Sequence, residues 1–181
     1  MTFQQFMKKY EVPTWSLIIF VYVAWASLMI FASEIPFYIW APSGVILLTI
    51  FGSVQHELMH GHPTKNQRLN DFLGSVPITI WCPYLIYKQS HLAHHNNEVI
   101  TCPLEDPESF YVSARTWNGL PDLGRKFLIF RNTLLGRLVI GPVEIVAVFW
   151  FQQARALLQN DKKARKAWAL HILGLIPVIA F

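Results

Sequence analysis

The chain has 181 residues, of which 53% are hydrophobic and only 14% are charged. Soluble domains carry about 25% charged residues, so this composition is typical of a membrane protein. The net charge of +4 comes from basic residues spread between apolar blocks, which argues against a nucleic-acid-binding surface. The two cysteines, Cys82 and Cys102, occur singly and support neither a disulfide scaffold nor a zinc ribbon.

The N-terminal part of the chain contains two uncharged runs, over residues 14–32 and residues 36–55. Each is close to the roughly 20 residues that a helix needs to cross the apolar core of a bilayer. The link between the runs is only long enough for a tight turn. We therefore expect a transmembrane helical hairpin, which returns the chain to the side of the membrane on which it began.

Residues 72–87 are apolar but short, and Pro77 and Pro83 interrupt them. Asn70 and Asp71 precede this stretch and are of the type that caps the start of a helix. A span here would place the histidines before and after it on opposite faces of the membrane, where they could not share a metal. The sequence therefore predicts an interfacial or re-entrant segment.

Further spans are expected over residues 132–151 and from residue 168 to Phe181, where an apolar run reaches the last residue. The predicted fold class is all-α, a polytopic membrane protein with one incomplete domain over residues 1–181. We expect the N-terminus and the histidines on the cytoplasmic face, with the C-terminal part of the domain lying beyond Phe181.

Six of the seven histidines fall in two short motifs, HELMHGH and HLAHH. The first histidine group is His56, His60 and His62, and the second is His91, His94 and His95. His56 and His60 are spaced i, i+4 and point the same way on a helix, and the spacing i, i+3 and i+4 puts all three histidines of the second group on one face. Gly61 and Pro63 flank His62 and are expected to end the first helix there, so the spacing does not set the direction of His62. Imidazole binds zinc, copper, iron and nickel, and five or six imidazoles exceed what one zinc ion requires. Two metal ions are therefore the simplest interpretation.

Other interpretations apply to the same residues. HELMH matches the helix of zinc metalloproteases, with Glu57 as general base, which makes an intramembrane protease an alternative. That enzyme needs a third ligand and has no use for HLAHH. Metal transport or sensing is a third hypothesis, but its histidines should line a path inside the spans. We interpret His171 as an interfacial polar residue.

The acidic residues after the second histidine group form a short cluster, which we interpret as a solvated loop. Its members are Glu98, Glu105, Asp106 and Glu108.

The paired motifs resemble the first two histidine boxes of the membrane fatty acid desaturase superfamily. The likeness extends through HPTKNQRLNDFLGSVP and TCPLEDPESFY, which look like a bacterial branch. It implies a non-haem di-iron centre on the cytoplasmic face of a bacterial inner membrane. Carried over residue by residue, it implies as ligands His56, His60, His91, His94 and His95, with His62 as a sixth candidate. Glu57 would then lie behind the ligands without binding the metal.

The same resemblance implies an oxidoreductase that uses two irons and O₂ to introduce a double bond into a fatty acyl chain. Related hydroxylases and carotenoid ketolases share these boxes and are the alternative. Expected partners are a lipid substrate and an electron donor such as ferredoxin or a cytochrome b5-like protein, without nucleic acid. The superfamily has a third HxxHH box, which we expect beyond Phe181.

Overall fold

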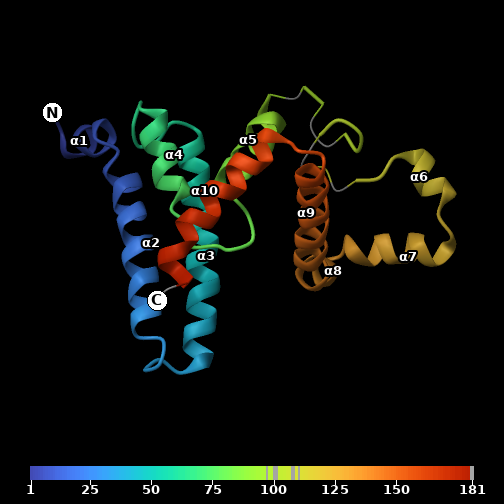
Figure 1. The fold of residues 1–181 in the computed structure, drawn as a ribbon, viewed down its shortest axis with the longest axis horizontal. Coiled ribbons are helices and arrows are strands. Elements are labelled where there is room, and N and C mark those ends of the chain that lie inside the picture. The colour runs from blue at the N-terminus through green and yellow to red at the C-terminus, as the bar shows by residue number, and fades with distance from the viewer. Residues whose placement is uncertain (97, 100–101, 107–108, 110, 180–181) are drawn as a thin grey trace. The chain divides into compact units, whose positions relative to one another are not determined.

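The computed structural model describes residues 1–181 except 97, 100–101, 107–108, 110 and 180–181. Its described residues form ten helices and no strand, which confirms the predicted all-α class (Figure 1). The chain divides into two compact units, residues 1–88 with 167–181 and residues 89–166. Both boundaries fall inside a helix, so α5 and α10 each begin in one unit and end in the other.

The first unit is built on a helical hairpin. Its first three helices are α1 (Phe3–Lys9), α2 (Val12–Ile30) and α3 (Phe37–Met59). α2 and α3 lie side by side (Figure 1), and the indole nitrogen of Trp40 donates a hydrogen bond to the carbonyl of Leu28 (3.1 Å). By length and composition both helices could cross a membrane, in agreement with the spans predicted at 14–32 and 36–55.

Regularly spaced apolar residues hold the hairpin together. Phe51, Val54 and Leu58 are three and four residues apart and are almost completely buried, so they form one stripe along α3. Val21 on α2 belongs to the same core, and the ring of Tyr22 packs edge-on against Phe51 at a centroid distance of 5.9 Å. This packing continues to Leu58, so it fixes the end of α3 that carries the first histidines.

The apolar stretch at 72–87 is not one helix. It is divided between the end of α4 (Gln67–Ser75), an irregular linking segment (residues 76–83) and the start of α5 (Tyr84–His95). The predicted cap at Asn70 is wrong, because Asn66 caps α4 by accepting from the backbone N–H groups of Arg68 and Leu69. Asn70 lies buried inside the helix, where its side chain bonds to Thr64.

Side chains of the hairpin donate hydrogen bonds to the backbone carbonyls at the end of α4. The last carbonyls of a helix have no partner within it, and here they lie beside apolar helices. The Tyr22 hydroxyl donates to the carbonyls of Leu73 (2.6 Å) and Val76 (3.0 Å), and the Gln55 amide donates to that of Gly74 (2.9 Å). Irregular backbone within a membrane requires such partners. The bonds fit the predicted re-entrant segment, and its depth in a membrane stays a prediction.

The last helix of the chain also contacts the linking segment. α10 (Lys162–Ile179) begins earlier than the apolar run predicted from residue 168, because Asp161 caps it. His171 is buried, and its Nε2 lies 3.3 Å from the carbonyl oxygen of Ile80. A side chain at Gly174 would clash with Pro77. His171 therefore packs in the interior of this unit, and its place at a membrane interface stays a prediction.

The second unit contains four further helices, α6 (Ala114–Gly119), α7 (Asp122–Arg131), α8 (Leu134–Val139) and α9 (Gly141–Leu158). The span expected at 132–151 is thus divided between α8 and α9. The Thr133 hydroxyl caps α8 by accepting from Gly136, and Pro142 lies in the first turn of α9. Whether α9 or α10 crosses a membrane stays a prediction, as does the rest of the polytopic topology.

Candidate metal centre

The first histidines lie where α3 ends. His56 is in the last turn of the helix and His60 is its C-cap residue. The i, i+4 spacing places the two rings one above the other, with centroids 4.6 Å apart. After His60 the chain turns at Gly61, whose φ of +84° favours glycine. The turn ends the helical register, so only the first two histidines of HELMHGH share a face.

The second histidine group forms the last turns of α5. His91 is buried, and its ring lies 4.5 Å from that of His95, centroid to centroid. His94 is adjacent in sequence to His95, and these two rings are farther apart, at 5.8 Å. The i, i+4 pair therefore repeats the arrangement at the end of α3.

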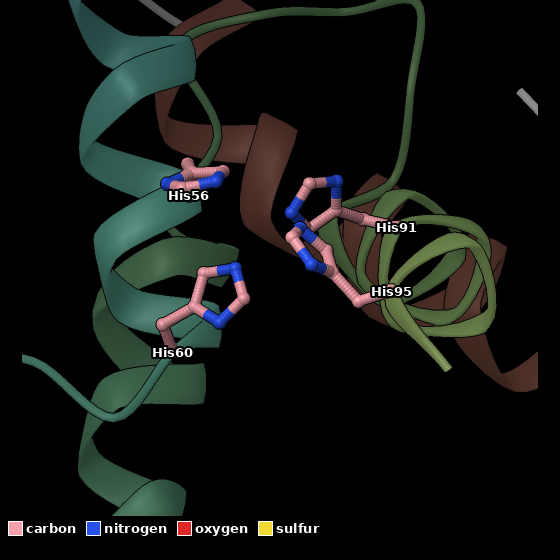
Figure 2. Close-up of side chains that lie close together, drawn as sticks. All are labelled: His56, His60, His91 and His95. Carbon is pink, nitrogen blue, oxygen red and sulfur yellow. The ribbon is translucent and has the colours of Figure 1, made fainter. Parts of the chain in front are cut away.

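Four imidazoles from the two helices come together. One ring nitrogen from each of His56, His60, His91 and His95 lies within 4.8 Å of all the others, and Figure 2 shows the rings facing one another. Two nitrogens bound to one ion at about 2.1 Å can be at most about 4.2 Å apart. Small ring rotations would therefore gather these nitrogens around an ion, and the donors are of the type that iron accepts.

A set of hydrogen bonds and one salt bridge around Asp71, here called the clasp, anchors the start of α5 in the first unit. One carboxylate oxygen of Asp71 accepts hydrogen bonds from Lys88 (2.6 Å), Gln67 (2.9 Å) and the Tyr84 hydroxyl (3.1 Å). Burial and then the negative charge of Asp71 raise the pKa of Tyr84, so the phenol stays protonated and donates. Lys88 is one turn before His91. The clasp thus holds the first half of α5, one turn before the second histidine group.

His94 is not a member of the four-nitrogen group. Its Nδ1 lies 2.7 Å from a carboxylate oxygen of Asp106, whose side chain is only 1% exposed. The sequence places Asp106 in the acidic cluster interpreted as a solvated loop and gives no sign of its contact with His94. Glu98 and Glu105 are exposed as predicted, so Asp106 is an exception in that cluster. Glu108 lies outside the described residues.

His62 and Glu57 also lie outside the four-nitrogen group. His62 Nδ1 is 3.2 Å from a carboxylate oxygen of Glu11, at the start of α2. Glu57 lies 3.5 Å from His56 Nδ1, and both side chains are about 40% exposed. A carboxylate beside Nδ1 fits the predicted place of Glu57 behind a ligand. The roles of all these residues toward a metal stay predictions.

Comparison with known proteins identifies the family to which the chain belongs. The sequence profile described as fatty acid desaturase matches residues 33–181, a range that includes both histidine groups. The chain belongs to the fatty acid desaturase family. This membership confirms the resemblance seen in the two histidine motifs.

Two curated relatives match parts of this chain. The chain is 29% identical over 89 residues to the omega-3 fatty acid desaturase fat-1 of Caenorhabditis elegans, covering 45% of this chain and 21% of the relative. It is 42% identical over 45 residues to the zeaxanthin 4-ketolase of Chlamydomonas reinhardtii, covering 23% of this chain and 10% of the relative. The chain thus matches about a fifth or less of the length of each relative. No solved structure gives a significant match.

Proposed function

We propose that this desaturase-family chain forms part of a membrane-bound di-iron oxidoreductase that introduces a double bond into a fatty acyl chain. The observation that carries the proposal is the group of four imidazole nitrogens within 4.8 Å of one another, supplied by α3 and α5. Family membership supports an oxidoreductase that acts on lipids, and the histidine group is compatible with its metal site.

In this proposal, iron would be held by His56 and His60 from α3 and by His91 and His95 from α5. His94 is a fifth ligand, and Glu57 stands behind His56. When bound, a pair of non-haem irons supplies the O₂-dependent chemistry that removes hydrogen from unactivated C–H bonds, which acid–base side chains cannot do. The chain itself holds the imidazoles in place before the ions bind, through the stripe on α3 and the clasp at Asp71.

The zinc protease alternative finds no support in this arrangement. A metalloprotease site would combine His56 and His60 with one further ligand and leave a general base beside the metal. Instead, the described residues bring two histidines of α5 to the same place, and the group contains no carboxylate. The match with the ketolase keeps a hydroxylase or ketolase in the same oxidoreductase class as the second candidate.

The surroundings of the site complete the proposal. The hairpin of α2 and α3 would anchor the protein in a bacterial inner membrane, with the N-terminus and the histidines on the cytoplasmic face. The substrate would be a lipid or fatty acyl chain, with O₂ as co-substrate. Electrons would come from a donor such as ferredoxin or a cytochrome b5-like protein.

Metal analysis and lipid profiling test this function together. The chain is expressed in a bacterial host together with the segment expected to carry the third HxxHH box and is purified in detergent. Its metals are then measured by mass spectrometry. We expect about two irons per chain, a new double bond in the host's fatty acids by gas chromatography, and loss of both in His91→Ala. The matched variant His62→Ala should keep its iron.

The other outcomes separate the alternatives. A hydroxylated or oxidised lipid product, in place of a new double bond, would show that the chain belongs to a hydroxylase or ketolase. One tightly bound zinc in place of iron would support the protease, and variable metal loading would support transport or sensing. Full iron loading in His91→Ala would refute the proposed site.

A further inference from the structure

We propose that Asp106 is a positioning residue that holds His94 in the tautomer whose Nε2 is available to iron. This inference rests on the proposed function, because it concerns a ligand of the proposed iron site. It adds a residue that the histidine motifs do not contain. Asp106 lies twelve positions beyond His94, outside both motifs.

The short contact decides which ring nitrogen carries the proton. An ionised carboxylate has only acceptor atoms, so at 2.7 Å the Nδ1 of His94 must donate to Asp106. A neutral imidazole then has its remaining lone pair on Nε2, which is the atom that binds a metal. The bond involves a charged acceptor, which makes it stronger than a bond between neutral groups.

Burial makes the contact between Asp106 and His94 different from the contact between Glu57 and His56. The Asp106 side chain is 1% exposed and His94 is 22% exposed, whereas Glu57 and His56 are both more than 40% exposed at 3.5 Å. Solvent screens the second pair but not the first. Of the two, Asp106 is therefore the carboxylate able to fix the orientation of a histidine ring.

The backbone around Asp106 is itself held in place. Its N–H donates to the carbonyl of Cys102, and its carbonyl accepts from the N–H of Ser109, both at 3.1 Å. These two hydrogen bonds hold the backbone of the residue whose carboxylate contacts His94 on α5. Metal-binding histidines commonly donate their second N–H to a carboxylate, and removal of such a partner weakens metal binding about 10–100-fold.

Four variants of the purified full chain test the assignment. Asp106→Leu removes the acceptor, Asp106→Asn keeps the shape without the charge, and Asp106→Glu keeps the charge. Glu98→Gln is the matched control, because Glu98 is an exposed carboxylate in the same stretch. The measurements are ferrous iron affinity by chelator competition and the visible absorption bands of the cobalt(II)-loaded protein, each on folded, monodisperse material.

We expect iron affinity to fall about 10–100-fold in Asp106→Leu and by a smaller factor in Asp106→Asn. The cobalt(II) bands should shift in both, recover in Asp106→Glu and stay unchanged in Glu98→Gln. If Asp106→Leu does not fold, the nearly isosteric Asp106→Asn decides. Unchanged affinity and bands in folded Asp106→Asn and Asp106→Leu would overturn the assignment while leaving the proposed function intact. Failure of the unmodified chain to bind iron would overturn both.

Discussion

Replacing Asp71 by alanine should loosen α5 and lower the stability of the first unit. The substitution removes the acceptor of three hydrogen bonds, two of which come from Tyr84 and Lys88 on α5. A bond to a charged group contributes about 1.5–3 kcal/mol, but these three share one oxygen and Asp71 is 29% exposed, so they do not add fully. We expect a loss of about 3 kcal/mol, or about 6–12 °C in melting temperature.

Thermal unfolding in detergent, followed by tryptophan fluorescence, measures this change, and iron loading measures its effect on the centre. The control is Asp122→Ala, because Asp122 is 90% exposed in its ion pair with Arg125 and should contribute almost nothing. Iron affinity should fall in Asp71→Ala alone, because His91 is one turn beyond Lys88. Equal melting temperatures for the two variants would refute the clasp as a source of stability.

Two other substitutions probe the contacts around the linking segment. Gly74→Ala would bring its Cβ within 2.5–2.9 Å of the Tyr84 ring, so we expect a clear drop in melting temperature, whereas Gly52→Ala has open space and should not lower it. Tyr22→Phe removes the donor to two backbone carbonyls and should cost about 1–3 kcal/mol in chemical unfolding. Tyr38→Phe, at an exposed tyrosine, should not change the free energy of unfolding measurably. Equal effects of the two tyrosine variants would contradict the role of the Tyr22 hydroxyl in holding the end of α4.

The hairpin and the histidine pairs could be predicted because their signals are local. Uncharged runs of span length and i, i+4 spacing depend only on helix geometry, and the structure has α2, α3 and both histidine pairs in these forms. The break between α8 and α9 also has local signals, at Thr133 and Pro142. They were outweighed by the apolar run that contains them.

Tertiary contacts set the features that the sequence did not reveal. Asp106 lies twelve positions beyond His94 and outside both motifs, so no helical spacing rule connects the two residues. His171 bonds to Ile80, ninety-one positions away. The glycine turn after His60 separates His62 from the other histidines, although all three belong to one motif. In each case the packing of helices and loops against one another determines which residue the side chain contacts.

The hydrogen bonds from Tyr22, Gln55 and His171 have a consequence for the entropy of metal binding. They restrict the chain between the two histidine groups when the protein folds, before an ion is present. Small zinc domains differ, because their ligands become ordered only when the metal binds, and that ordering reduces the affinity. Here an arriving ion should need only ring rotations, so metal removal should leave the helix content, measured by circular dichroism, unchanged.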